Sequence, residues 1–285
     1  MSKEYKNVIS IPVHEKPEVI IDLLCNIKKY TKNTAVVLHV SKGFNWNSLY
    51  LNKEKFIRSI EEMEDVYINP EHLDTKWAGI IQTHISNFKY MDSNIDFENF
   101  VLMASNQLLI SYDMDKWIGN NIIGVRNWQK LDVWDWVFKS KALNDKCFQN
   151  ILKEINTENI FLCVPEGSFY NRKIFEKIVE IVDTYYVFDI EEETYPREEV
   201  YIPTIALSMV EEEKVRKGIF TEWIDGSLIS GKLSKIIESG QISVKPVTRD
   251  LYTDNRIYLR QVYNGGYFDM VKKYFPDIIW IEQSN

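Results

Sequence analysis

The chain alternates short, nearly continuous hydrophobic runs with longer segments in which hydrophobic residues recur every three to four positions. The short runs are rich in β-branched residues, and we interpret them as strands buried on both faces. The longer segments have the pattern of amphipathic helices. We expect strands at 7–13, 34–40, 65–68 and 160–164, a strand running into a loop over 97–110, and helices at 16–30, 76–91, 171–184 and 201–209.

This alternation predicts an α/β fold with a mainly parallel, Rossmann-type sheet flanked by helices on both faces. The middle segment, 116–158, is less periodic, and we expect part of it to be a helix and part an irregular loop; hydrophobic periodicity resumes at 268–274. No repeat or low-complexity linker marks a boundary. We therefore expect one domain over 1–285, with a nucleotide-binding half at about 1–115 and an acceptor and catalytic half at about 160–285.

Polar residues follow several of the predicted strands. In an open parallel sheet, ligands bind in the crevice beyond the carboxyl ends of the strands, so these positions are candidates for binding. The candidates are His14, Ser41, Ser105, Asn106, Glu166, Gly167 and Ser168.

Charge and cysteine content narrow the class of protein. The 285 residues carry 34 Lys and Arg against 42 Asp and Glu, a net charge of -8, which disfavours a nucleic-acid partner. The three cysteines are far apart and form no CxxC pair, as expected in a reducing compartment. The N-terminus has neither a signal-peptide pattern nor a membrane span. We expect a soluble, cytoplasmic protein, with peripheral contact at the inner face of the membrane allowed.

The order of several segments is typical of one enzyme family. Residues 13–18 precede a helix, 37–41 end the second strand, and Trp77-Ala78-Gly79 opens another helix. Residues 100–106 and 166–169 follow, and 196–204 contain an acidic pair, an aromatic residue and a threonine. From about residue 9 to residue 263, this order resembles the core-2 and I-branching β-1,6-N-acetylglucosaminyltransferase family, with its xylosyltransferase relatives.

The resemblance implies a GT-A-like fold and an inverting transfer from a nucleotide-sugar to a glycan hydroxyl. The implied donor is a UDP-sugar, with N-acetylglucosamine as the expected sugar. The implied acceptor is a glycan or lipid-linked oligosaccharide of bacterial surface polysaccharide. Glu199 matches the base that takes the acceptor's proton, and Glu198 beside it would raise its pKa. Alternatively, both acids only stabilise the start of the following helix through its macrodipole.

The leaving diphosphate needs positive charge, from a metal ion or from side chains. The family that the chain resembles uses basic residues late in the chain, which implies a site with no metal and no cofactor. The corresponding residues here are Lys245, Arg249, Arg256 and Arg260, although Gln261 stands where the family has lysine. Arginine suits this role because it holds phosphate oxygens bidentately. The alternative is that these side chains only solvate a surface loop.

Other candidate chemistry has simpler explanations. Asp113-Met114-Asp115 fits the Asp-x-Asp metal motif, but it lies well past the predicted strand, where capping a helix is the simpler role. His14, Ser41 and Trp77 are candidates to contact the nucleotide. The tryptophans between 117 and 136 either stack on acceptor sugars or pack in the core.

Three other functions remain open from the sequence. One is a transferase that uses a different nucleotide-sugar. Another is a nucleotidyltransferase, which would need a metal site and a Gly-rich phosphate loop that the sequence does not show. The third is a glycan-binding relative without catalytic activity.

Overall fold

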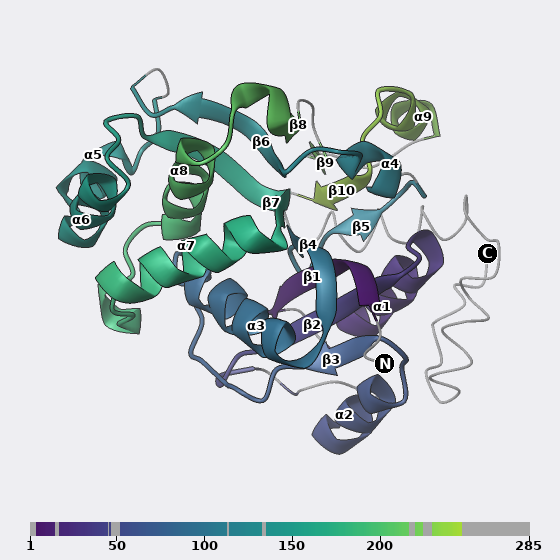
Figure 1. Ribbon diagram of the computed structural model, residues 1–285. Helices are drawn as coiled ribbons and strands as arrows, with labels where there is room; N and C mark the ends of the chain where they lie inside the picture. Colours follow the sequence, from purple (N-terminus) through teal and green to yellow (C-terminus); the bar gives the residue numbers. More distant parts are fainter. Residues whose placement is uncertain are drawn as a thin grey trace.

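The computed structural model describes residues 4–14, 17–44, 46, 52–112, 114–132, 135–216, 220–224 and 230–246. Within them, a seven-stranded sheet has the order β3-β2-β1-β4-β7-β6-β8 (Figure 1). Its strands are β1 (Glu4–Val13), β2 (Thr34–Val40), β3 (Val66–Ile68), β4 (Asp96–Leu102), β6 (Ile123–Lys130), β7 (Phe161–Asn171) and β8 (Val215–Arg216). A three-stranded sheet, β5-β10-β9, contains β5 (Leu108–Leu109), β10 (Ser243–Pro246) and β9 (Thr221–Ile224).

Strand pairing in the large sheet is mainly parallel. The pairs β2–β3, β1–β2, β1–β4 and β6–β8 are parallel, whereas β7 runs antiparallel to both β4 and β6. The carboxyl ends of β1 and β4 therefore lie side by side, and polar residues that follow them can share one crevice. The predicted fold class, a mainly parallel sheet flanked by helices, is confirmed.

Successive residues of the central strands point into two different cores. Val8 and Val37 pack with helix α3 (Ile81–Asn94) and helix α7 (Arg172–Tyr185) in one core. Ile9 and Leu38 pack with helix α1 (Pro17–Tyr30) and helix α2 (Lys53–Glu61) in the other. Figure 1 shows α3 and α7 side by side on the face of the sheet nearer the viewer. The period-two alternation and burial on both faces explain the continuous hydrophobic runs in the sequence.

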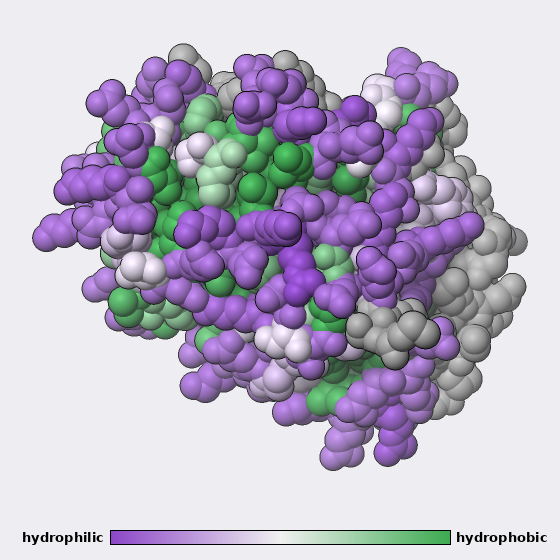
Figure 2. All heavy atoms as spheres, viewed as in Figure 1, coloured by the Kyte–Doolittle hydropathy of each residue, from purple (hydrophilic) through white to green (hydrophobic). Residues whose placement is uncertain are grey.

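The remaining helices pack at several places around the two sheets. They are α4 (Met114–Ile118), α5 (Lys139–Asn144), α6 (Lys146–Glu154), α8 (Tyr201–Ser208) and α9 (Ser230–Glu238), with 3-10 turns η1 (Ile190–Glu192), η2 (Arg197–Glu199) and η3 (Glu212–Lys214). In Figure 2 the visible face is mainly hydrophilic, with hydrophobic side chains gathered over α8, β6 and β7. Within the described part of the chain, no helix combines the length and the apolar character that crossing a membrane requires.

Several predicted boundaries match the structure closely, and three do not. The helix expected from residue 76 begins at Ile81, because Ala78 has φ +74° and Gly79 N–H closes a turn on the Lys76 carbonyl at 3.0 Å. The middle segment contains the strand β6 as well as helices. The strand expected to end at 164 continues to Asn171. The periodicity at 268–274 lies outside the described residues.

β7 continues past residue 164 because it forms a bulge. On β6, Gly124 pairs with Phe169 and Arg126 pairs with Val164, so four residues of β7 lie opposite the single residue Val125. The Ser168 hydroxyl donates to the Val164 carbonyl across the bulge at 3.2 Å. The prediction that 166–168 follow the end of a strand is therefore wrong, because they lie within β7 and antiparallel pairing resumes beyond them.

Gly167 allows this bulge to approach the smaller sheet. It has φ +87°, and a Cβ on it would lie 2.4 Å from Thr221 Oγ1 and 2.5 Å from Phe220 Cδ1. Thr221 is itself buried and accepts a 2.9 Å hydrogen bond from Gln107 Nε2, so it cannot move without losing a partner. Glycine is needed here for both its conformation and its size.

Gly167→Ala is expected to lower the free energy of unfolding by about 2–3 kcal/mol, since it combines an unfavourable φ with overlap in a packed interior. Urea denaturation measures the change. Gly240→Ala is the matched control: Gly240 also has a positive φ (+83°), but a Cβ there would meet no atom of the described residues within 4 Å beyond its chain neighbours. Equal losses of unfolding free energy in the two variants would show that the close approach to Thr221 does not contribute to the effect of Gly167→Ala.

Candidate active site

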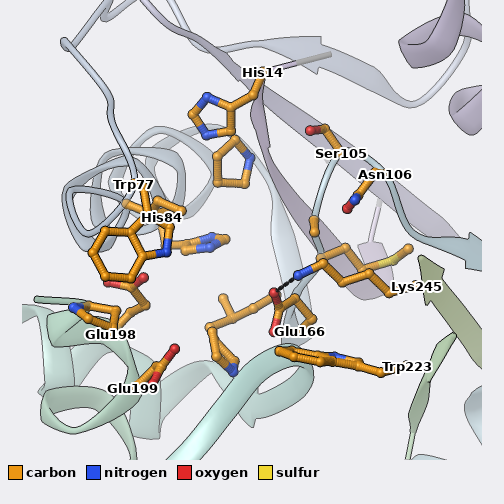
Figure 3. Close-up of a pocket in the computed structure, with 17 residues that line it drawn as sticks. His14, Trp77, His84, Ser105, Asn106, Glu166, Glu198, Glu199, Trp223 and Lys245 are labelled. Carbon is orange, nitrogen blue, oxygen red and sulfur yellow. Dashed lines mark hydrogen bonds and ion pairs between the residues drawn. The ribbon is translucent and has the colours of Figure 1, made fainter. Parts of the chain in front are cut away.

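A pocket of about 450 Å³ opens where β1, β4, the β7 bulge, η2 and the smaller sheet meet, a size typical of small-molecule sites. Figure 3 shows Glu198 and Glu199 on the opposite side of this pocket from Lys245 and Trp223. The pocket is lined by Pro12, His14, Trp77, Ile80, His84, Leu102, Met103, Ala104, Ser105, Asn106, Pro165, Glu166, Pro196, Glu198, Glu199, Trp223 and Lys245. The structure thus brings together eight of the residues that the sequence singled out.

The acidic pair lies on the 3-10 turn η2, directly before α8. Glu199 N–H donates to the Pro196 carbonyl at 3.1 Å, which closes the turn. Thr204 on α8 donates to the Phe161 carbonyl at 3.2 Å and accepts from Phe161 N–H at 2.9 Å, tying the helix to the start of β7. The acids therefore do precede a helix, but they also face the pocket, which capping alone does not require.

A buried ionic cluster fixes η2 from behind. The Arg197 guanidinium donates to Asp145 at 3.0 Å and to Glu193 at 2.6 Å. Asp145 also accepts from the hydroxyls of Tyr195 at 2.7 Å and Tyr201 at 2.9 Å. Burial alone would raise the pKa of Asp145, but these hydrogen bonds and the Arg197 charge lower it, so it stays ionised.

Glu199 is partly buried, and its environment suits a proton acceptor. Burial, followed by the negative charge of Glu166, raises its pKa to about 7, although a hydrogen bond from Trp136 and the charge of Lys245 act in the opposite direction. A carboxylate with a pKa near neutrality is a stronger base than an ordinary one and is still ionised in part of the population at pH 7. This geometry supports general-base chemistry at Glu199.

Glu198 differs from its neighbour because it is almost fully buried, with 4% exposure. Burial raises its pKa to about 8, and the negative charges of Glu199, Glu166 and Glu193 add to this effect. Its Oε2 atom is buried and has no hydrogen-bond partner within the described residues. At neutral pH, Glu198 is therefore mostly the uncharged carboxylic acid.

A charged group occupies the other side of the pocket. Lys245 of β10 forms an ion pair with Glu166 from the β7 bulge, and its ammonium group lies 4.9 Å from the centre of the Trp223 ring. Both charged side chains are less than one-fifth exposed. Lys245 is the cation that the described part of the pocket offers to an anionic ligand.

Residues that follow β1 and β4 also line the pocket. His14 comes directly after β1, and its Nδ1 lies 3.4 Å from the Thr75 hydroxyl. Ser105 and Asn106 come after β4, and Trp77, which is 65% exposed, contributes its indole ring (Figure 3). The parallel pairing of β1 with β4 explains why residues about 90 positions apart in the chain meet here.

His84 and Trp223 were not predicted from the sequence. His84 lies on α3 within an amphipathic pattern, where a histidine among core positions gives no sign of facing a pocket. Trp223 lies on a four-residue strand of the smaller sheet, and the sequence gives no signal of how that sheet packs on the larger one. Long-range packing, rather than any local pattern, brings both side chains to the site.

Other predicted site residues lie elsewhere. Ser41 follows β2 and is buried outside the pocket lining, because β2 is one strand further from β4 than β1 is. Gly167 and Ser168 are buried inside the β7 bulge, with structural roles. The remaining three, Arg249, Arg256 and Arg260, lie outside the described residues.

The tryptophans of the middle segment have different roles. Trp117 packs in the core against Phe169 and Phe220, so its alternative as a sugar platform is wrong. Trp136 packs on Tyr195 and donates a hydrogen bond to Glu199. Trp134 and the Trp128 side chain lie outside what the structure describes. The exposed indoles that line the pocket are instead Trp77 and Trp223.

Asp115 of the Asp-x-Asp segment is not part of the pocket lining. Asp115 accepts a 2.7 Å hydrogen bond from Asn7 Nδ2 and lies 3.7 Å from Lys6 Nζ, while Asp113 is outside the described residues. Within the described ranges, no group of three or more His, Cys, Asp or Glu side chains is arranged to hold a metal ion.

No protein-family model matches the sequence, and no curated protein matches it. The fold is similar to that of solved glycosyltransferases. The galactosyltransferase LgtC, in complex with donor and acceptor sugar analogues, has 9% identity over 94% of this chain and 95% of that chain, with a TM-score of 0.45. A glycosyltransferase involved in glycosylation of the major capsid of PBCV-1 has 9% identity over 90% of this chain and 99% of that chain, with a TM-score of 0.44. GlyE of Streptococcus pneumoniae TIGR4 has 9% identity over 96% and 64% of the two chains, with a TM-score of 0.44.

Proposed function

We propose that the chain is an inverting, metal-independent glycosyltransferase that moves a sugar, N-acetylglucosamine in our assignment, from UDP to a glycan hydroxyl in surface polysaccharide synthesis. The observation that carries the proposal is the position of Glu199. It is a partly buried carboxylate with its pKa raised to about 7, on the wall of a pocket at the carboxyl ends of β1 and β4. The sequence resemblance, which is independent of this geometry, assigns the base to the same residue.

In this proposal the pocket residues and the late arginines divide the roles between them. Glu199 takes the proton of the acceptor hydroxyl while the oxygen of that hydroxyl forms a bond to the anomeric carbon. The bond from that carbon to the diphosphate breaks, and the electron pair leaves with UDP. Lys245, together with Arg249, Arg256 and Arg260, supplies positive charge to the leaving group. Trp77 and Trp223 offer aromatic faces for the sugar rings.

Glu166 holds Lys245 in place and also tunes the base. Its negative charge raises the pKa of Glu199, and the Lys245 charge lowers it. When a diphosphate engages Lys245, the ammonium charge is shared with the ligand and its effect on Glu199 weakens. Donor binding therefore makes Glu199 a stronger base, so the two substrates act cooperatively in this scheme.

UDP is expected to raise the melting temperature in excess EDTA, since a ligand that binds the folded state stabilises it and side chains replace the metal.

Arg249→Ala and Arg260→Ala should each weaken UDP binding by about 1.5–3 kcal/mol, the range for charge-assisted hydrogen bonds. Thermal shift and calorimetry measure both effects. Lys177→Met is the control, because Lys177 is exposed on α7 and pairs with Glu180 on the same helix.

The outcomes separate the alternatives. Loss of the thermal shift on chelation would contradict the metal-free mechanism and favour a nucleotidyltransferase or another metal-dependent enzyme. UDP binding without transfer to any acceptor would favour a glycan-binding relative without catalytic activity. Wild-type affinity in both arginine variants would place the diphosphate site elsewhere.

A further inference from the structure

A chain of hydrogen bonds fixes the tautomer of His84. Glu71 N–H donates to Asn69 Oδ1 at 3.0 Å, which fixes the orientation of the Asn69 amide because a backbone N–H must meet an acceptor. Asn69 Nδ2 then donates to Asn87 Oδ1 at 3.0 Å. Asn87 Nδ2 in turn donates to the Ser10 hydroxyl oxygen at 3.0 Å. The direction of each bond follows from the one before it.

The last bond of this chain places a proton on the pocket side of His84. Ser10 Oγ lies 2.8 Å from His84 Nδ1. Because Ser10 Oγ already accepts from Asn87, its own hydroxyl proton needs an acceptor, and within the described residues that acceptor is His84 Nδ1. Nδ1 is therefore the acceptor, and the neutral ring carries its proton on Nε2. His84 lines the pocket with 4% exposure, and burial lowers its pKa to about 3, with the charges of His39 and His14 acting in the same direction. Nε2–H is thus a neutral donor.

Glu198 provides a second neutral donor on the same wall. Its carboxyl group is buried, its Oε2 atom has no partner within the described residues, and the charged groups that act on it are the acids Glu199, Glu166 and Glu193. In Figure 3, His84 and Glu198 lie on the same side of the pocket, beside Trp77. A protonated carboxyl group donates through its O–H.

We propose that His84 Nε2–H and the Glu198 carboxyl O–H are a neutral donor pair that binds an uncharged oxygen of the sugar, and that they select an acylated amino sugar over a free one. The carbonyl oxygen of an acylamino group is a strong acceptor with two lone pairs. A free amino sugar lacks that acceptor, because its ammonium group only donates hydrogen bonds. It could pair with Glu198 only if the carboxyl group gave up its proton, and burial of Glu198 disfavours the charged form, which costs binding energy. The sugar assignment rests on the proposed function, whereas the donor assignment does not.

The donor assignment is tested without any ligand. In ¹⁵N spectra, His84 is expected to be the neutral Nε2–H tautomer from pH 8 down to pH 5, and Ser10→Ala should disturb that signal. In ¹³C spectra of carboxyl-labelled protein, one glutamate should titrate above pH 7 and be lost in Glu198→Gln, while Glu199→Gln removes a different signal. A proton on His84 Nδ1, or Glu198 titrating near pH 4.5, would overturn the assignment.

The selectivity is tested with methyl N-acetylglucosaminide and methyl glucosaminide, titrated into UDP-saturated protein at pH 6.5 and followed by NMR. Wild type should bind the acylated sugar at least tenfold better. Glu198→Met, which has a similar length but no donor, should lose about fivefold to tenfold of that affinity, the effect of one neutral hydrogen bond. Glu198→Gln keeps an N–H donor and should restore it to within about threefold.

The two proposals fail in distinguishable ways. Equal binding of the two sugars, or wild-type affinity in Glu198→Met, would overturn the selectivity while UDP binding still supported the proposed function. If the NMR titrations show both donors but neither UDP nor either sugar binds, the sugar assignment falls together with the proposed function, and the donor pair serves a different ligand.

Discussion

Glu199→Gln is expected to lower the turnover of sugar transfer by roughly 10²–10⁴-fold, the range that a positioned general base contributes. Glutamine keeps the size of the side chain and can still hydrogen-bond to Trp136, but it cannot accept the proton of the acceptor hydroxyl. Donor affinity should be unchanged, because the interaction that is lost belongs to the transition state. The measurement is the transfer rate at saturating donor, with UDP affinity and melting temperature measured alongside.

The pH dependence of transfer should report the same group. Glu199 must be ionised to accept a proton, so the rate should rise with pH through about 7 and fall tenfold per unit below it. Glu166→Gln removes a negative charge and frees Lys245, and both changes lower the pKa of Glu199, so the acidic limb should move to lower pH. Trp136→Phe removes a hydrogen bond that lowers the pKa, so the limb should move the other way.

Glu198→Gln is the matched control for the base, since it changes the adjacent carboxyl group without removing the base. Its fall in turnover should be smaller than that of Glu199→Gln. If Glu198→Gln is inactive and Glu199→Gln is nearly normal, the roles of the two acids are reversed. If both variants remain active, the pair only begins a helix, and Glu166 becomes the next carboxylate to test.

Arg197→Met is expected to destabilise the fold by about 3–5 kcal/mol, because it removes the cation from a buried ionic cluster. The Glu193 and Asp145 side chains are 1% and 8% exposed, so neither can recover its lost partner from water. Asp145 also caps α6 by accepting from Cys147 N–H at 2.9 Å, so the disturbance should spread to that helix. Chemical denaturation at pH 7 measures the loss.

The control for this prediction is Lys177→Met, which breaks an ion pair of similar length in water. Lys177 and Glu180 lie 2.8 Å apart with more than half of each side chain exposed, and such pairs contribute less than about 0.5 kcal/mol. A loss below about 1 kcal/mol in Arg197→Met would contradict the view that this cluster holds η2, and with it Glu198 and Glu199, in position.

Much of the sheet could be predicted because its strands are buried on both faces. The prediction for residues 34–40 matches β2 to the residue, and the helix starting at residue 171 is confirmed within one residue. Each of these segments carries its own signal, either a continuous β-branched run or a 3.6-residue period. The alternation of strands and helices predicted a mainly parallel sheet, so His14, Ser105 and Asn106 were candidates for the crevice beyond its strand ends. That β1 and β4 are neighbours is seen only in the structure.

The features that the sequence did not predict depend on contacts between distant segments. The β7 bulge depends on the close approach of Gly167 to Thr221. A single glycine in the sequence does not indicate which distant residue it will contact. β6 was missed because its pairing with β7 and β8, rather than a clean alternation, makes it a strand. The pairing of Lys245 with Glu166, 79 residues apart, and the hydrogen bond between Ser10 and His84 both arise from the folded arrangement.

The most direct test of the central claim is an NMR assay of sugar transfer from a panel of UDP-sugars in excess EDTA, comparing wild type with Glu199→Gln. We expect wild type to release UDP and to form a product whose anomeric configuration is inverted relative to the donor, with N-acetylglucosamine as the preferred sugar. Glu199→Gln, folded and still binding UDP, should form that product at least 10²-fold more slowly. A retained anomeric configuration, or equal rates in the two proteins, would contradict the account.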